Sequence, residues 1–493
     1  MNARLIALSC AAAAVGFTIY GSAGRADDPQ AGRTAAEEDA QVLTRGPVHE
    51  AFAATASPDP RPGITAAKAP PAAINELPPA HKPLGAEVAW IPGYWAWDDE
   101  QNDFLWLSGI WRVVPPGRQW VPGYWIAANG KSQWTSGYWA AADAEEVEYL
   151  PEPPPTLEAG PNAEAPSADH LWTPGNWVWS SQRYAWRSGF WTTVQPNWLW
   201  SPARYVWTPR GYVFIDGFWD GTAERRGVLF APVRFRSGAT GAQNFAYSPT
   251  MAIDLGVFAD YLFLRPNYGH YYFGDYYAPN YQTSGYFAWN RTRPHFGYDP
   301  FYAQRRWERR SDRNWEQSVQ TQFQQRRDNP EARPPRTLIA ANQLAAQSGN
   351  RTAASPPLVV SLDQLAKSKF SPVRMQAMDP EERRRLTEQV GEVRKYGEGR
   401  RRIEAGAAQA PGGKIAGATE PVRLKLPAAP IAAKAVPGAE GGSAGLPRRP
   451  EAPKPDPRIA PGTKRVAGGP DPSRYPPNVE RPSVEPKRTA APP

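Results

Sequence analysis

Few residue groups in the sequence could form a catalytic or metal centre. The five histidines are His49, His81, His170, His270 and His295. None stands at the spacing of a metal-ligand pair, so we expect scattered, solvated side chains. Asp254, Asp260 and Asp275 could supply the two carboxylates of a glycoside hydrolase, although turn and capping roles are more common for such residues. We predict no catalytic residue, no cofactor and no metal.

Two short motifs match catalytic signatures without their context. Gly441-Gly-Ser-Ala-Gly445 has the pattern of a nucleophile elbow, but it lies in Pro-rich sequence that predicts neither the strand nor the helix that must present the serine. Gly130-Lys131-Ser132 lacks the upstream glycine of a phosphate-binding loop and is typical of a hairpin turn. Neither motif therefore supports an enzyme.

Tryptophan has the most informative spacing. Of 21 tryptophans, 18 lie between Trp90 and Trp219. They form copies of a Trp-x-x-Gly-x-Trp repeat: Trp90-Ile-Pro-Gly-Tyr-Trp95, Trp106-Leu-Ser-Gly-Ile-Trp111, Trp120-Val-Pro-Gly-Tyr-Trp125, Trp134-Thr-Ser-Gly-Tyr-Trp139, Trp172-Thr-Pro-Gly-Asn-Trp177 and Trp186-Arg-Ser-Gly-Phe-Trp191. Decayed copies follow at Trp200-Ser-Pro-Ala-Arg-Tyr205 and Phe214-Ile-Asp-Gly-Phe-Trp219. Within each block the copies step by 14 residues, except for a first step of 16.

This pattern resembles the bacterial WxxGxW (YXWGXW) repeat proteins. The resemblance implies export and a repeat architecture, and it implies no particular activity or ligand. The seventh copy departs from the motif, because Ala203 and Arg204 replace the glycine and the aromatic residue. We expect an irregular strand there.

A 14-residue repeat suits one β-strand of about ten residues and a turn of about four. Two tryptophans five residues apart would lie on opposite faces of a regular strand, but a bulge at the glycine would return both to one face. We therefore favour bulged strands in an antiparallel meander with a ladder of tryptophans. The alternative is a type II turn at Pro-Gly, which gives two short strands per copy.

The aromatic side chains are also the candidate binding residues. A Trp ladder could be core, or an exposed surface on which pyranose rings stack, and the Tyr-rich loop at residues 267–277 could bind sugars or cover the end of the sheet. Candidate polymer-binding residues are Trp95, Trp111, Trp125, Trp139, Trp177, Trp191, Tyr271, Tyr272, Tyr276 and Tyr277. We expect most tryptophans to be buried and a minority exposed, because exposing all of them would promote aggregation.

The fold class predicted is mainly β, an antiparallel meander of Trp-rich repeats followed by one or two amphipathic helices, with long disordered termini. The expected parts are a signal peptide (1–26), a disordered leader (27–80), a first repeat block (84–139), a Pro-rich linker or strap (140–169), a second block (170–220), a β-rich extension with the Tyr-rich loop (221–298), a helical region (299–404) and a disordered basic tail (405–493). Within the helical region we expect one helix over residues 299–327 and another that begins after Asp379.

Arg4 and the apolar run at residues 5–19 are typical of an export signal, and Cys10 inside that run is the single cysteine. The formal net charge is +8, with much of the excess in the tail. We predict a non-enzymatic protein of the periplasm, cell envelope or exterior, structural or bound to an acidic envelope polymer or glycan, without nucleic acid and without a membrane span after signal cleavage. A carbohydrate-active hydrolase and a cell-wall glycan-binding module are the alternatives, and the oligomeric state is not predicted.

Overall fold

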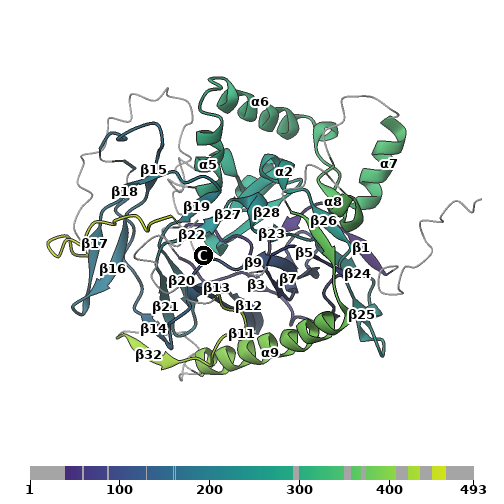
Figure 1. Cartoon of the computed structure of the whole chain (residues 1–493), viewed down its shortest axis with the longest axis horizontal. Coiled ribbons are helices and arrows are strands. Elements are labelled where there is room, and N and C mark those ends of the chain that lie inside the picture. The colour runs from purple at the N-terminus through teal and green to yellow at the C-terminus, as the bar shows by residue number, and fades with distance from the viewer. Residues whose placement is uncertain are drawn as a thin grey trace, which may run out of the picture.

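The computed structural model describes residues 39–57, 60–85, 88–128, 130–158, 160–161, 163–291, 299–348, 357–367, 373–406, 420–433 and 447–461. Within them the fold is mainly β, as predicted, and its strand pairs are antiparallel except for β4 Asn75–Glu76 with β25 Ala246–Tyr247. In Figure 1, helices α5 Pro300–Glu308, α6 Trp315–Asp328 and α7 Leu338–Ser348 lie along one edge of the strands, and α9 Pro380–Ala405 lies along the opposite edge.

Two consecutive copies of the repeat form one long hairpin. In the first hairpin, β7 Tyr94–Asp98 pairs with β8 Asp103–Leu107, and β6 Val88–Ile91 pairs with β9 Ile110–Val113. This register places Trp95 opposite Trp106 and Trp90 opposite Trp111, with ring centroids 5.2 and 5.1 Å apart in edge-to-face contacts. Cross-strand aromatic pairs of this kind each stabilise a sheet by about 0.2–1 kcal/mol.

Three further hairpins repeat this register. The second contains β10 Arg118–Val121, β11 Tyr124–Ala128, β12 Lys131–Thr135 and β13 Tyr138–Ala141; the third contains β15 His170–Thr173, β16 Asn176–Ser180, β17 Arg183–Arg187 and β18 Phe190–Thr193; the fourth contains β19 Trp198–Ser201, β20 Arg204–Thr208, β21 Gly211–Ile215 and β22 Phe218–Gly221. In each, the aromatic residues that open and close the two copies form two cross-strand pairs, and the only one of these pairs without tryptophan is Tyr205 with Phe214 in the decayed copies.

Each copy forms two short strands rather than the single bulged strand that we favoured. The dipeptide between them is here called the kink. It is Pro-Gly or Ser-Gly in six copies and Pro-Ala or Asp-Gly in the two decayed copies, and it separates strands that belong to different sheets. Trp90 and Trp95 of one copy consequently enter different hydrophobic clusters instead of sharing a face. The kink glycines do not have positive φ, so the kink is not a type II turn either.

The kink glycines are required because two backbones cross there. A Cβ built on Gly123 would lie 2.4 Å from Cζ2 of Trp134 and 2.9 Å from the backbone nitrogen of Gly137. Gly137 in turn is covered by Trp120, whose Cζ2 would lie 2.6 Å from a Cβ. The first tryptophan of each copy therefore covers the glycine of the opposite copy, which explains why the two residue types recur together.

The predicted disordered leader over residues 27–80 is wrong for the part of it that the structure describes. Residues 39–83 contribute β1 Ala40–Val42, β2 Gly46–Pro47, β3 Thr65–Ala66, β4 and β5 His81–Pro83. Each strand pairs with one that comes later in the chain, as β1 does with β24 Val233–Phe235. Val48, Ala51 and Phe52 are buried in the largest hydrophobic cluster. Open sheet edges supply the backbone partners that the Ala- and Pro-rich sequence cannot supply to itself.

The segment between the two repeat blocks follows the sheet. It begins with β14 Glu146–Leu150, which pairs with β21 and with β32 Val422–Lys425. The Pro-rich residues after it lie against the third hairpin, where the hydroxyl of Tyr184 donates to the carbonyl of Pro151 and the indole nitrogen of Trp177 donates to the carbonyl of Pro155.

Residues 221–291 add short elements that close the sheets. They include β23 Gly227–Val228, β24, β25, β26 Met251–Ile253, α2 Leu255–Phe258, β27 Leu262–Arg265, β28 His270–Phe273, α3 Pro279–Thr283 and β29 Phe287–Ala288. Helix α2 is capped by Asp254, whose carboxylate accepts from the backbone N–H of Gly256.

The helical region contains more helices than predicted. The expected helix over residues 299–327 is divided into α5 and α6, and α7 and α8 Leu362–Lys367 were not predicted. Two short strands, β30 Val359–Ser361 and β31 Met375–Ala377, pair with β26 and β5. The local signals for these short elements are weak, because each is positioned by the sheets against which it packs.

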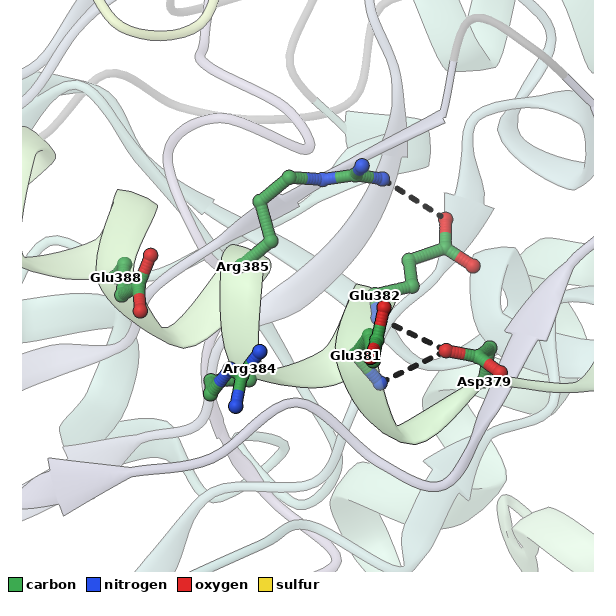
Figure 2. Close-up of a pocket in the computed structure, with 6 residues that line it drawn as sticks. All are labelled: Asp379, Glu381, Glu382, Arg384, Arg385 and Glu388. Carbon is green, nitrogen blue, oxygen red and sulfur yellow. Dashed lines mark hydrogen bonds and ion pairs between the residues drawn. The ribbon is translucent and has the colours of Figure 1, made fainter.

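Helix α9 begins where the sequence predicts. The carboxylate of Asp379 accepts from the backbone N–H groups of Glu381 and Glu382, as Figure 2 shows. Val390 and Val393 of its predicted apolar stripe are buried against the strands. The N-terminal end of α9 is thus defined by a side-chain cap at Asp379, which can be identified from the sequence.

Parts of the predicted disordered tail at residues 405–493 also join the fold. Besides β32, the carbonyl of Ile431 accepts from the backbone N–H of Trp120 at 2.8 Å, and Ile431 is buried. Asp456 pairs with Trp186 of the third hairpin, and the carbonyl of Arg448 accepts from the indole N–H of Trp219 in the fourth. The tail segments occupy free sheet edges, as the leader does.

Replacing Gly123 by Val should destabilise the protein, because the added carbons overlap Trp134 and backbone atoms that cannot move aside. We expect a loss of about 3 kcal/mol or more in the free energy of unfolding, measured by urea denaturation. Gly391→Ala in α9, where the added carbon meets open space, is the control and should be neutral or slightly stabilising. Equal stability of the two variants would contradict this account of the kink.

Candidate functional site

The aromatic residues proposed as a binding surface lie mostly in the interior. Eight of the ten are buried, namely Trp95, Trp111, Trp139, Trp177, Tyr271, Tyr272, Tyr276 and Tyr277, and only Trp125 and Trp191 are partly accessible. All 21 tryptophans lie in described residues, and each of them is buried or partly buried. The expectation that most would be buried is confirmed, whereas the expectation of an exposed minority is wrong.

The indole nitrogens of these tryptophans bind other parts of the same chain. Those of Trp95, Trp111 and Trp139 donate to carbonyls of Ala72, His81 and Ala51 in the segment before the first repeat block, at 2.9, 3.1 and 3.1 Å. In the second block, those of Trp177 and Trp191 donate to Pro155 and Ala163, at 3.0 and 3.2 Å. Trp125 donates to the carbonyl of Trp95. The partners are thus mainly Ala- and Pro-rich extended segments.

The predicted Tyr-rich loop is partly a strand, because His270–Phe273 form β28 within a four-stranded sheet. Tyr272, Tyr276 and Tyr277 form a buried cluster with Phe263, Tyr281 and Tyr286. The guanidinium of Arg45 lies 4.4 Å from the ring centroid of Tyr276, a cation–π distance. The four candidate tyrosines are therefore part of the core.

The kink of the first hairpin binds a carboxylate. Glu76, from the predicted leader, accepts from the backbone N–H groups of Gly93 and Gly109 at 2.7 and 2.9 Å and from the indole N–H of Trp106 at 3.0 Å. Three donors converge because the crossing of the kinks leaves both glycine N–H groups outside the strand ladder. Burial raises the pKa of Glu76 to about 7, and the three donors oppose this by favouring the charged form.

Two other hairpins hold a glutamate in the same way. In the second, Glu50 accepts from the N–H of Gly137 and the indole of Trp134, both at 2.8 Å. In the third, Glu158 accepts from the N–H of Gly175 and from the indole of Trp172. The fourth hairpin differs, because Asp216 stands inside its own kink and accepts from the N–H of Gly217. A kink is therefore a carboxylate-binding site made of glycine N–H and tryptophan N–H groups.

Sequence reasoning missed these glutamates, although a signal for two of them exists. Glu76 and Glu158 both precede the glycine that they bind by 17 residues. An acidic residue at a fixed distance before each repeat block could therefore have been read as part of the motif. Glu50 has no such regular spacing.

A buried ion pair closes the other side of the second kink. The guanidinium of Arg400, on α9, donates to the carbonyls of Pro122 and Ser136 at 2.8 and 2.9 Å. Its partner Glu404 lies 2.9 Å away and accepts from the hydroxyl of Tyr124. Both charged side chains are fully buried, so this pair fixes α9 on the sheet.

The sequence profile of the WXXGXW repeat matches residues 88–112, 168–192 and 196–220, which are the first, third and fourth hairpins. The chain carries the WXXGXW repeat. The second hairpin, outside the matched residues, has the same register of WXXGXW copies, with Trp120 opposite Trp139 and Trp125 opposite Trp134. No curated protein and no solved structure matches the chain.

Two histidines are buried beside the second WXXGXW kink, contrary to our expectation of scattered, solvated side chains. His270 lies 2.9 Å from Glu50 and its other nitrogen is 2.6 Å from the carbonyl of Tyr268. Burial lowers its pKa, but the carboxylate of Glu50 raises it more, so the net pKa of His270 is raised. His49 hydrogen-bonds the carbonyl of Pro92, and burial lowers its pKa to about 4, which keeps it neutral.

The remaining candidates for chemistry are dispersed. Asp254 caps α2, and Asp275 pairs with Arg336 at 2.7 Å. The hydroxyl of Tyr277 and Arg326 both donate to the backbone carbonyl of Asp260. Gly441-Gly-Ser-Ala-Gly445 and Cys10 lie outside the described residues. Among the described residues there is no group of three or more potential metal ligands and no helix long and apolar enough to cross a membrane.

One surface region is strongly basic. The end of α5 and the loop before α6 carry four exposed arginines, here called the arginine cluster: Arg306, Arg309, Arg310 and Arg313. Arg306 pairs with Glu316 and Arg310 with Asp169, whereas no ion pair within the described part of the chain involves Arg309 or Arg313. Trp307, half-buried, lies under Arg310 with 4.2 Å between guanidinium and ring centroid.

Glu76→Gln should be strongly destabilising, because the amide cannot accept from three donors and brings an N–H group against one of them. We expect a loss of about 2–4 kcal/mol in the free energy of unfolding. Glu158→Gln, at a half-buried site, should cost less, and exposed Glu388→Gln should be neutral. A Glu76 variant as stable as the Glu388 variant would show that the kink does not need a carboxylate.

The pair of His270 and Glu50 should make stability depend on pH. A raised folded-state pKa means that the stabilisation is fully present below the ordinary value of 6.5 and is lost as the pH rises through the pKa of the folded protein. The stability advantage of the wild type over His270→Gln should therefore shrink as the pH rises above about 6.5 in urea titrations. An advantage that grows with pH would contradict the charged pair.

Proposed function

We propose that the chain is an exported, non-catalytic protein of the bacterial cell envelope, with a structural role and with affinity for an acidic envelope polymer. Export is supported by the apolar run at residues 5–19 behind Arg4 and by a sequence with no cysteine beyond residue 10. The polymer partner is supported by the formal net charge of +8.

The structural part of the proposal is supported by the way in which the repeat uses its own polar groups. The kink donors are occupied by Glu50, Glu76 and Glu158, and the indoles of the candidate tryptophans bind main-chain carbonyls. A binding surface for a foreign polymer would leave such groups accessible. The repeat therefore serves to build a rigid body from segments that are distant in sequence.

The observation that carries the polymer-binding part is the arginine cluster. Arg309 and Arg313 are exposed cations that make no ion pair among the described residues, beside two further exposed arginines. The start of α9 offers a contrast. There Arg384 and Arg385 lie among Asp379, Glu381, Glu382 and Glu388, as Figure 2 shows, so their charge is compensated locally. A polyanion should therefore prefer the arginine cluster.

Sedimentation with isolated cell walls tests this role. The full mature chain should pellet with the walls at low salt and be released at high salt, because exposed charges are screened within about 10 Å at 0.1 M. Arg309→Gln with Arg313→Gln should lower the affinity roughly tenfold or more, since each cation near an anionic surface contributes about 1 kcal/mol.

The control is Arg384→Gln with Arg385→Gln, which removes the same charge from the acid-compensated region and should leave binding nearly unchanged. A chain that ends at Pro461 keeps every described residue and tests the six basic side chains beyond it. If the full chain stays in the supernatant at low salt, the polymer-binding role is wrong. Equal losses in both double variants would assign any binding to net charge alone.

A further inference from the structure

A small cavity adjoins the second kink and is separate from the arginine cluster. It has a volume of about 50 Å³ and lies between residues 50–63, the kink glycine Gly137, strand β20 and the turn at residues 266–269. Among its lining residues are Thr55, Arg61, Arg204 and Tyr268. Segments from four separate parts of the chain thus converge on one polar space.

Arg204 is the residue that makes this cavity unusual. It stands where other copies of the repeat have Tyr, Ile, Asn or Phe, so this hairpin turns a guanidinium inward. Its exposed fraction is only 8%, yet within the described residues its guanidinium donates one hydrogen bond, to the hydroxyl of Ser201 at 3.2 Å. No ion pair within the described residues involves it. Burial lowers the pKa of Arg204 to about 10, and the nearby carboxylates of Asp220 and Glu50 only partly oppose this.

The neighbouring carboxylates, Asp220 and Glu50, already form ion pairs with other residues. Asp220 lies 2.6 Å from Nη2 of Arg112 and 3.1 Å from Nε of Arg226, so two buried arginines share one carboxylate. Glu50, which lines the cavity, pairs with His270 and accepts from the second kink. The charges around the cavity therefore leave an excess of buried positive charge at Arg204.

A second buried group faces the same space without a partner. Thr55 is 3% exposed, and its hydroxyl makes no hydrogen bond to the protein. A buried hydroxyl without a partner costs roughly 1–3 kcal/mol, so an acceptor in the cavity would be favoured. Since one water needs about 10–15 Å³ of such volume, the cavity has room for a few waters or for one small oxyanion.

We propose that this cavity binds a small oxyanion, a phosphate or a carboxylate group, which accepts from the guanidinium of Arg204 and the hydroxyl of Thr55. Arg61, which is exposed at the cavity, adds positive charge on the path of entry. The bound anion neutralises the excess charge and joins the leader to the fourth hairpin. It would therefore stabilise the folded protein by mass action.

Calorimetric titration of the full chain with inorganic phosphate and with acetate, at constant ionic strength set with potassium chloride, tests the site. At least one anion should bind, and comparing the two shows which oxyanion geometry the cavity accepts. Arg204→Met should weaken binding about thirtyfold or more, because it removes a charge-assisted hydrogen bond of about 2 kcal/mol. Thr55→Val should weaken it about fivefold.

Thr55→Val is the variant that keeps the test decisive if Arg204→Met fails to fold, since replacing an unpartnered hydroxyl should not harm the free protein. Arg236→Met, at an exposed arginine outside the cavity lining, is the matched control and should bind as the wild type does. No binding of either anion overturns the proposal. So does binding that neither Arg204→Met nor Thr55→Val weakens. The site uses no residue of the arginine cluster, so its failure leaves the polymer-binding proposal untouched.

Discussion

The fold depends on the crossing of two backbones at opposed glycines beneath tryptophan rings. At this crossing Gly123 and Gly137 approach too closely for any side chain, and Trp120 and Trp134 cover them. The crossing turns each strand from one sheet to another, which removes glycine N–H groups from the strand ladder. Those groups are buried and require acceptors. A glutamate from outside the repeat supplies them, so a hairpin of this kind is completed by another segment of the chain.

This dependence explains which parts of the fold could be predicted. The repeat copies, the hairpin at Gly130 and the start of α9 at Asp379 are specified by neighbouring residues, and sequence reasoning placed them. The leader and parts of the tail were assigned to disorder because their own composition cannot bury enough apolar surface. Their order comes from indole donors such as Trp95, 23 residues from Ala72, and from sheet edges up to hundreds of residues away, and a local pattern does not contain that information.

The candidate site shows the same limit. Counting aromatic residues identified the positions that matter, but their burial depends on what covers them. A continuous bulged strand would have had one face exposed to solvent and one face packed against the core. The kink instead sends Trp90 and Trp95 into separate clusters, so both ends of a copy are covered. The tyrosines at residues 267–277 are buried for a related reason, since Tyr272 and Tyr276 pack in one cluster and Arg45 covers the ring of Tyr276.

The charged residues fall into two groups: buried ion pairs that stabilise the fold, and arginines without an ion pair that remain able to bind a partner. Arg400 with Glu404 and Arg112 with Asp220 are buried and paired, and removing one member of such a pair leaves an uncompensated charge, which is why they fix the fold. Arg204 is buried without an ion pair, and Arg309 and Arg313 are exposed and make no ion pair among the described residues. Since the kink glutamates and the indoles of the candidate tryptophans are bound within the chain, these arginines are where the protein retains binding capacity. Because Arg204 is buried, it suits a small anion. The arginine cluster is exposed and suits a large polyanion, whose binding should weaken with salt.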